Sequence, residues 1–443
     1  MKQLIADFSK STGKIRKKLH CSGYAPAIST QNIRNFNNEF KDLKMTSTRT
    51  HDMALQNSGQ RVVDTHFIFP LMHLDPKDPR NYFFKATDIL LNNIMKSGSE
   101  VFYRLGTSIE HSLPENHINT IPPDNFEKYA EVLAGIIRHY NHGWAEGYHL
   151  GIKYWEIWNE PNLPGGRMWA GDLKLFHRFY GIVSKRLKQE FPEIMVGGPS
   201  FCDAGEECLR NFFSYCREEQ APLDFISWHC YGDNPSKILG QPGAVRKLAD
   251  EYGFTATETI LNEWHYLVSW NGLSANITEE SFRNRLEGVR GLYGIDSAAY
   301  NVLVFIGFHD TPLDASFYYG FGDGYWGITN IYKGLSKNYY SLLAIGEFID
   351  TYSDRVEVSS DTSVWVIAAK NKQGECAVLV SNYRDADISI ELKISGCNVN
   401  NLKVLRLDQK DNLCEIPASF ENGIVKLEKS APESAVFLVT FTE

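Results

Sequence analysis

The chain has 443 residues, which is long for one ordinary domain and sufficient for a large core with a smaller second module. Hydrophobic residues make up 43% and charged residues 22% of the sequence, values typical of globular proteins. The formal net charge is −9 and no basic block occurs along the chain, so nucleic-acid binding is not expected. The 8 cysteines are scattered without a CxxC pair, which indicates reduced thiols and offers no ligand set for zinc.

Targeting and cofactor signals are equally sparse. Residues 1–7 lack the long apolar core of a signal peptide, and no segment has the length of a membrane span. The sequence therefore predicts a cytoplasmic protein, or a periplasmic or secreted one if a signal peptide was removed. The glycine-rich run at residues 320–324 follows no simple strand-to-helix turn, and we interpret it as a loop rather than a phosphate-binding site. No cofactor, metal or membrane partner is predicted, and the oligomeric state is left open.

Strand-like and helix-like patterns alternate from the N-terminal region to about residue 348. After a short strand within residues 2–8, β-type runs predict eight strands at residues 15–21, 45–51, 100–106, 153–159, 194–198, 223–229, 258–262 and 301–308. Helical spacing of apolar residues predicts helices at residues 80–97, 124–141, 171–191, 278–299 and 336–350. Eight parallel βα units predict an α/β fold that closes into a (β/α)8 TIM barrel. A doubly wound sheet is the alternative, but its nucleotide fingerprint is missing.

The pattern changes after about residue 351, where short β-type runs alternate with turn signals. This texture predicts a C-terminal antiparallel β-sandwich, and the N-terminal strand is a candidate to join it. We therefore expect residues 14–348 to form a barrel that carries any catalytic site. Residues 1–13 and 349–443 are expected to form an accessory β-sandwich domain.

Two glutamates stand at the ends of predicted strands. The fourth strand ends at Asn159-Glu160, where Pro161 removes a backbone donor, and the seventh ends at Asn262-Glu263. TIM barrels keep their chemistry at the C-terminal ends of the strands, and strands four and seven lie across the barrel mouth. Two carboxylates flanking a glycosidic bond are what glycoside hydrolysis requires. Their separation, about 5–5.5 Å for retention or 6.5–9.5 Å for inversion, is not readable from sequence.

A family resemblance supports this interpretation. The segment Trp158-Asn159-Glu160-Pro161-Asn162-Leu163 resembles the acid/base motif of clan A glycoside hydrolases. Residues 48–52 resemble the Arg-x-His element of the second strand, and residues 224–231 resemble the sixth-strand segment with a His and a Tyr. Residues 260–264 stand where the nucleophile is placed. In this order the segments resemble glycoside hydrolase family 39, the family of β-xylosidases and α-L-iduronidases.

The resemblance implies a retaining mechanism with two catalytic residues. Glu160 would be the general acid and then the base, and Glu263 would be the nucleophile. Asn159 would hold the sugar 2-hydroxyl, and Tyr231 would hydrogen-bond the nucleophile. The residues implied to line the sugar subsite are His229, His51 and Arg49.

The eighth strand departs from the family pattern. Ile306 stands where relatives often carry a Trp as the floor of the sugar site, and we expect Trp326 to supply that floor. His309 follows the predicted eighth strand and is expected at the same end of the barrel. Arg104 and Arg167 are candidate partners for a uronate carboxylate. The substitutes for Glu263, should it be structural, are Glu258, Glu156 and Asp310.

The sequence predicts a retaining, exo-acting, β-xylosidase-like glycoside hydrolase that takes a carbohydrate substrate. An endo-acting hydrolase or a transglycosidase of the same clan would use the same residues. A carbohydrate-binding protein without activity is a further alternative, although both carboxylates are present.

Overall fold

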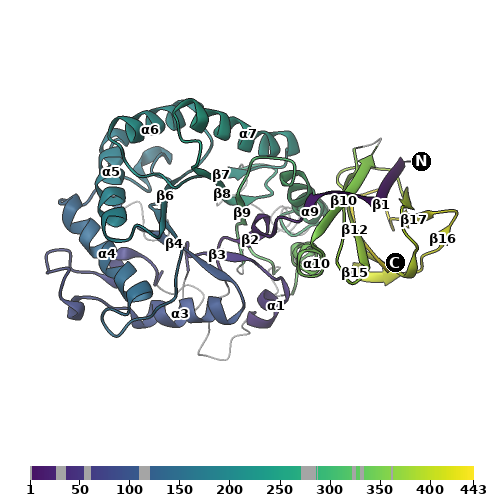
Figure 1. Cartoon of the computed structure of the whole chain (residues 1–443), viewed down its shortest axis with the longest axis horizontal. Coiled ribbons are helices and arrows are strands. Elements are labelled where there is room, and N and C mark those ends of the chain that lie inside the picture. Colours follow the sequence, from purple (N-terminus) through teal and green to yellow (C-terminus); the bar gives the residue numbers. More distant parts are fainter. Residues whose placement is uncertain are drawn as a thin grey trace.

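The structure is a computed structural model, which describes residues 2–25, 36–53, 61–108, 120–270, 286, 288–321, 326–329, 334–360 and 363–443. Two sheets organise these residues, a closed eight-stranded barrel and a separate sheet of ten strands. Figure 1 shows the barrel ringed by helices, with the ten-stranded sheet beside it and next to α9 and α10.

The barrel strands follow the order of the chain, and all of them pair in parallel. They are β2 (Cys21–Ser22), β3 (Ser47–Arg49), β4 (Glu100–Leu105), β5 (Tyr154–Ile157), β6 (Met195–Phe201), β7 (Phe225–Tyr231), β8 (Glu258–His265) and β9 (Ala315–Tyr318). The last strand pairs with β2 and closes the ring. The predicted TIM barrel is confirmed.

The longer helices of the ring are α3 (Lys85–Lys96), α4 (Phe126–His142), α5 (Leu173–Glu190), α6 (Glu206–Glu218), α7 (Pro235–Glu251), α9 (Ile295–Phe308) and α10 (Lys337–Thr351). Shorter ones are α1 (Asn37–Asp42) and α2 (Thr65–Ile68). Local sequence sets their ends. The side chain of Asn125 accepts from the Lys128 backbone N–H at the start of α4, and Gly143, at φ 73°, ends that helix. None of the helices in the described ranges has both the length and the apolarity to cross a membrane.

The predicted strand at residues 301–308 is wrong, because these residues form the second half of α9. Every residue of α9 is buried, since the helix packs between the barrel and the ten-stranded sheet. A helix that is apolar on all sides has no polar face to reveal its period, so its sequence resembles a buried strand. The true eighth strand, β9, follows six residues after α9. The predicted helix at 278–299 lies partly outside the described residues; residues 288–294 form turns and bends, and residues 295–299 are the start of α9.

The second sheet runs in the order β15-β14-β18-β12-β11-β10-β1-β13-β17-β16. Its strands are β1 (Lys2–Lys14), β10 (Asp354–Ser360), β11 (Trp365–Lys370), β12 (Glu375–Asn382), β13 (Ser389–Ser395), β14 (Asn400–Leu407), β15 (Asn412–Ile416), β16 (Phe420–Glu421), β17 (Ile424–Glu428) and β18 (Ala435–Thr442). All neighbours are antiparallel except β1 and β13. One apolar cluster takes side chains from both halves of this sheet, so the sheet folds over its own core as a sandwich.

An arginine of the second sheet joins it to the barrel. Arg384 follows β12, and its guanidinium donates to Asp296 at 3.1 Å, to Asp233 at 2.7 Å and to the Tyr266 hydroxyl at 2.9 Å. Asp296 is 2% exposed and also accepts from the Ser434 hydroxyl at 2.6 Å. The buried carboxylate therefore depends on donors from the neighbouring sheet.

Replacing Arg384 by Met should lower the free energy of unfolding by about 1–3 kcal/mol, because the buried Asp296 carboxylate loses a charged donor. Urea denaturation followed by circular dichroism measures the change. Arg210→Met is the control, since Arg210 pairs with Glu206 and Glu251 on the exposed surface and its loss should change little. Equal losses in both variants would contradict the role of Arg384.

Candidate active site

Glu160 follows β5 at a sharp turn of the backbone. Trp158 and Glu160 both have positive φ angles, of 76° and 45°, so the chain leaves the strand direction here. The Glu160 backbone N–H donates to the Ser200 carbonyl at 2.8 Å, which fixes the turn against β6. The Glu160 carboxylate then reaches β7, where its Oε1 lies 2.8 Å from His229 Nδ1.

Glu263 lies in β8 next to an irregularity of the sheet. Trp228 pairs with Leu261 and His229 pairs with Glu263, so Asn262 is an extra residue in β8. A β-bulge of this kind re-aims side chains, which allows both Asn262 and Glu263 to face the barrel interior. The bulge therefore places the Glu263 carboxylate beside the groups at the ends of β3 and β7.

The Glu263 carboxylate accepts two strong hydrogen bonds. Arg49 Nη1 donates to Oε2 at 3.1 Å, and the Tyr231 hydroxyl donates to Oε1 at 2.5 Å. Both donors favour the ionised form. Burial raises the pKa of the Tyr231 phenol well above its usual value, so Tyr231 keeps the proton that it donates. Both hydrogen bonds therefore stabilise the anionic form of this carboxylate.

The two glutamates lie close together. One carboxylate oxygen of Glu160, one of Glu263 and a ring nitrogen of His229 all lie within 4.8 Å of one another. Retaining glycosidases hold their carboxyl groups about 5–5.5 Å apart, and inverting enzymes about 6.5–9.5 Å apart. The spacing fits retention and leaves little room for the water of an inverting reaction.

The environments of these groups separate their protonation states. Burial raises the pKa of Glu160 to about 7, and the positive charge of Arg49 opposes this rise. Burial also raises the pKa of Glu263, while its charged and hydroxyl donors oppose the effect. Burial lowers the pKa of His229 to about 4, so the imidazole is neutral at pH 7. A protonated Glu160 beside an ionised Glu263 matches the acid and nucleophile of a retaining pair.

Arg49 is fully buried beneath the carboxylates. Its Nε donates to Glu156 Oε2 at 2.6 Å, and its Nη2 donates to Asn159 Oδ1 at 2.7 Å and to Ser200 Oγ at 2.8 Å. With the bond to Glu263, the guanidinium joins β3 to β5, β6 and β8. Asn159 is 1% exposed and lies beside this group.

His51 lies in a second polar cluster at the end of β3. Its Nδ1 accepts from Arg104 Nε at 3.1 Å, and its Nε2 lies 3.3 Å from Asp52. Asp52 also accepts from the Tyr319 hydroxyl at 2.7 Å. Arg104 is fully buried and donates to Asp64 at 2.6 Å. The Arg104 guanidinium is therefore engaged with protein groups, whereas Arg167 is exposed.

Trp326 lies among aromatic side chains near Glu263. Its ring centroid is 5.1 Å from that of Tyr231, 6.0 Å from that of Trp270 and 6.3 Å from that of Tyr319. Trp270 is 58% exposed, so the group includes a ring face open to solvent. Tyr231 thus joins these aromatic rings to Glu263.

The structure does not bring His309 to this site. His309 is the C-cap of α9, and its Nε2 accepts from the Arg16 backbone N–H at 3.2 Å. Its Nδ1 lies 2.9 Å from the Phe305 carbonyl oxygen. This expectation came from assigning the eighth strand to residues 301–308. The eighth strand is β9, and Tyr319 follows it directly.

Tyr319 and Ser200 were not named from the sequence, and the contacts of Glu156 and Asn262 were not predicted. Tyr319 was missed because β9 was not predicted, although its sequence, Ala315-Ser316-Phe317-Tyr318, is β-type and follows a Pro and an Asp. Glu156 was named as a substitute for Glu263, and the structure shows it in an ion pair with Arg49. Ser200 and Asn262 carry no signal in the sequence, since their orientation depends on irregular strand pairing.

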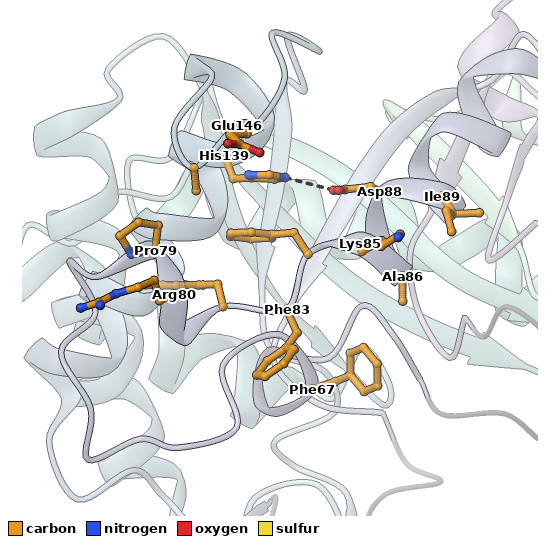
Figure 2. A pocket seen from close by; sticks show the side chains of 13 residues that line it. Phe67, Pro79, Arg80, Phe83, Lys85, Ala86, Asp88, Ile89, His139 and Glu146 are labelled. Carbon is orange, nitrogen blue, oxygen red and sulfur yellow. Dashed lines mark hydrogen bonds and ion pairs between the residues drawn. The ribbon is translucent and has the colours of Figure 1, made fainter.

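A separate pocket of about 840 Å³ lies on the outer wall of the barrel, between the start of α3 and the end of α4. Figure 2 shows Phe67 and Phe83 on one side of it and His139 on the other, where the ring lies 3.0 Å from Asp88. Phe83 is 61% exposed. None of the residues lining this pocket lies on a barrel strand, so it is distinct from the paired glutamates at the strand ends.

Paired carboxylates after the fourth and seventh strands of a TIM barrel are the arrangement of clan A glycoside hydrolases. A model of the family described as Glycosyl hydrolases family 39 matches residues 5–256, which is more than half of the chain. The chain belongs to this family.

Two curated relatives are β-xylosidases. The protein from Geobacillus stearothermophilus is 30% identical over 116 residues, covering 26% of this chain and 22% of the relative. That from Caldicellulosiruptor saccharolyticus is 24% identical over 312 residues, covering 65% and 58%. The matches therefore span less than two thirds of either relative.

Solved structures share the whole fold at low identity. A glucosidase from Croceicoccus marinus has a TM-score of 0.77 at 21% identity, covering 100% of this chain and 99% of that one. A monomeric β-xylosidase from Caulobacter crescentus has a TM-score of 0.75 at 15% identity, with the same coverage. The likeness extends over both the barrel and the second sheet.

Glu160 should titrate near neutral pH. Infrared difference spectra should show a protonated carboxyl band that disappears as the pH rises through about 7, because burial disfavours the charged form. Glu160→Gln should lack this band. A spectrum without a carboxyl titration near neutrality, or a band that persists in Glu160→Gln, would contradict the assignment.

Proposed function

We propose that the protein is a retaining, exo-acting glycoside hydrolase of the β-xylosidase type, which cleaves terminal glycosidic bonds of oligo- or polysaccharides. One observation carries the proposal: a carboxylate oxygen of Glu160 and one of Glu263 lie within 4.8 Å of each other, and the two carboxylates have different hydrogen-bond partners. Glu263 accepts from Arg49 and Tyr231, whereas burial holds the pKa of Glu160 at about 7. Residues 14–348 would be the catalytic unit, with 1–13 and 349–443 as an accessory domain.

The reaction would proceed by two displacements. Glu263 attacks the anomeric carbon while the C–O bond to the leaving group breaks, and the leaving oxygen takes the proton of Glu160. Water then attacks the anomeric carbon of the glycosyl-enzyme, the bond from this carbon to the Glu263 oxygen breaks, and Glu160 takes a proton from that water. Esterification removes the negative charge of Glu263. The positive charge of Arg49 is then less neutralised and lowers the pKa of Glu160 further. A lower pKa suits the role of Glu160 as the base of the second step.

The surroundings support a role for the other residues. Asn159 is held by Arg49 through its Oδ1, so its amide nitrogen can be directed to the sugar 2-hydroxyl. His51 and His229 would line the sugar subsite. Arg49 would orient the side chains of Asn159 and Glu263 through its hydrogen bonds to both. Trp326 would provide the apolar face on which the sugar ring stacks.

The contacts of Arg104 favour a neutral sugar. A uronate needs a cation whose charge is not already neutralised, and Arg104 is paired with Asp64 at 2.6 Å, which leaves only its Nη1 without a hydrogen-bond partner among the described residues. The curated relatives are named β-xylosidases, which supports xylose as the released sugar.

In a panel of 4-nitrophenyl glycosides, the β-D-xyloside is expected to give the highest kcat/KM. Proton NMR of the reaction should show the β-anomer as the first product, because two displacements retain configuration. A first-formed α-anomer, or a preference for a glycuronide, would contradict the proposal. Cleavage restricted to internal bonds of xylan would indicate the endo-acting alternative.

Replacing Glu263 by Ala should lower kcat by a factor on the order of 10⁴ or more, because the covalent step loses its nucleophile. Added azide should restore turnover of the aryl glycoside and give a glycosyl azide of inverted configuration. Glu258→Ala is the matched control. Glu258 begins the same strand, and its carboxylate accepts from Tyr154 at 2.8 Å. Wild-type rates in Glu263→Ala would exclude it as the nucleophile.

A further inference from the structure

Ser200 lies at an irregular point of β6, between β5 and β7. Gly198 pairs with Ile226 and Phe201 pairs with Trp228, so the register shifts across residues 199–200. Ser200 has φ 61°, which turns its buried hydroxyl into the barrel interior. The hydroxyl meets four side chains there, and none of the predicted roles accounts for it.

The hydrogen bonds of this hydroxyl can be counted. Arg49 Nη2 and Asn262 Nδ2 both donate to Ser200 Oγ, at 2.8 Å and 2.7 Å. The Asn262 amide is oriented by its second N–H, which donates to Glu156 Oε1 at 2.7 Å, because the reversed amide would place its oxygen against this carboxylate. A hydroxyl has two acceptor lone pairs, so both are occupied.

One hydrogen remains on Ser200 Oγ, with two acceptors nearby. His229 Nε2 is 2.6 Å away and Asn159 Oδ1 is 3.1 Å away. Asn159 Oδ1 already accepts from Arg49. A proton on His229 Nε2 would place a third donor against the filled oxygen, so this nitrogen must be the acceptor. The neutral imidazole then carries its single hydrogen on Nδ1.

We propose that Ser200 is a positioning residue that fixes His229 as the Nδ1–H tautomer. His229 then donates to Glu160 Oε1, at 2.8 Å, and cannot accept the Glu160 proton. That proton is left to Glu160 Oε2 and to the glycosidic oxygen. This consequence rests on the proposed function, whereas the tautomer itself does not depend on any activity.

Without the Ser200 hydroxyl, the other tautomer becomes accessible. His229 could carry its hydrogen on Nε2, and Nδ1 would then accept a hydrogen bond from protonated Glu160. The acid proton would point at the imidazole instead of the substrate. The protonated form of Glu160 would also be stabilised, so its pKa would rise.

Nitrogen-15 NMR of histidine-labelled protein tests the tautomer directly. Long-range proton–nitrogen correlations distinguish a protonated ring nitrogen from an unprotonated one, and His229→Asn assigns the signal. The wild type should carry the hydrogen on Nδ1, and Ser200→Ala should show the Nε2–H form. Ser227→Ala is the matched control, since Ser227 Oγ bonds Glu156 and the Ser200 backbone, and it should keep Nδ1–H. A wild-type Nε2–H tautomer would overturn the proposal.

Kinetics test the consequence with the same variants. Ser200→Ala should lower kcat/KM roughly 10- to 100-fold on an unactivated disaccharide but less than about threefold on a 4-nitrophenyl glycoside, which needs little acid assistance. The alkaline limb of its pH profile should move to higher pH. Ser200→Gly, which suits φ 61°, should reproduce both effects if Ser200→Ala does not fold.

The outcomes separate the two proposals. Equal losses on both substrates with an unmoved pH profile would overturn the positioning role of Ser200. Glu160→Ala, measured alongside, should lose activity selectively on the disaccharide. If Glu160→Ala has no such selectivity, the acid role fails, while the NMR result still decides the tautomer.

Discussion

The buried ion pairs of Arg49 hold the site together. One guanidinium contacts Glu156 and Glu263 and also donates to Asn159 and Ser200. A buried charge without a partner is costly, so each of these groups is tied to the presence of the others. Because one cation faces two carboxylates, a third negative charge nearby would be poorly compensated. This constraint and burial together favour a protonated Glu160.

Regular strands alone could not bring these groups together. Successive side chains of a strand point to opposite faces, yet Asn262 and Glu263 both reach the interior. The bulge in β8 lets both neighbouring side chains face the interior. The positive φ angles of Glu160, after β5, and of Ser200, in β6, likewise turn these side chains toward the site. The backbone irregularities of this barrel are thus concentrated where its polar network is built.

The sequence predicted the parts of the site that follow from strand ends. Glu160, Glu263, His229 and Tyr231 follow or end β-type runs, and the structure places them in contact. Arg49 was expected beside the sugar, and the structure places it beneath the carboxylates. Its position depends on buried partners in or directly after three other strands, β5, β6 and β8, which no local pattern encodes. The prediction of the eighth strand failed for a different reason. Because α9 is buried on all sides, its sequence lacks the alternation of polar and apolar residues that reveals a helical period.

The network also explains how one barrel can hold two glutamates in different states. Glu263 receives its donors from Arg49 and Tyr231, whereas the Glu160 carboxylate lies 2.8 Å from a neutral imidazole whose proton is set by Ser200. The same guanidinium donates to Ser200 and to Glu263, so it contributes both to the ionised form of Glu263 and to the proposed tautomer of His229 beside Glu160. In the proposed reaction, esterification of Glu263 need not change the Ser200 contacts, and His229 can still donate to Glu160. The ionised Glu160 that follows is then stabilised by an N–H that was already in place, and no rearrangement separates its acid role from its basic one.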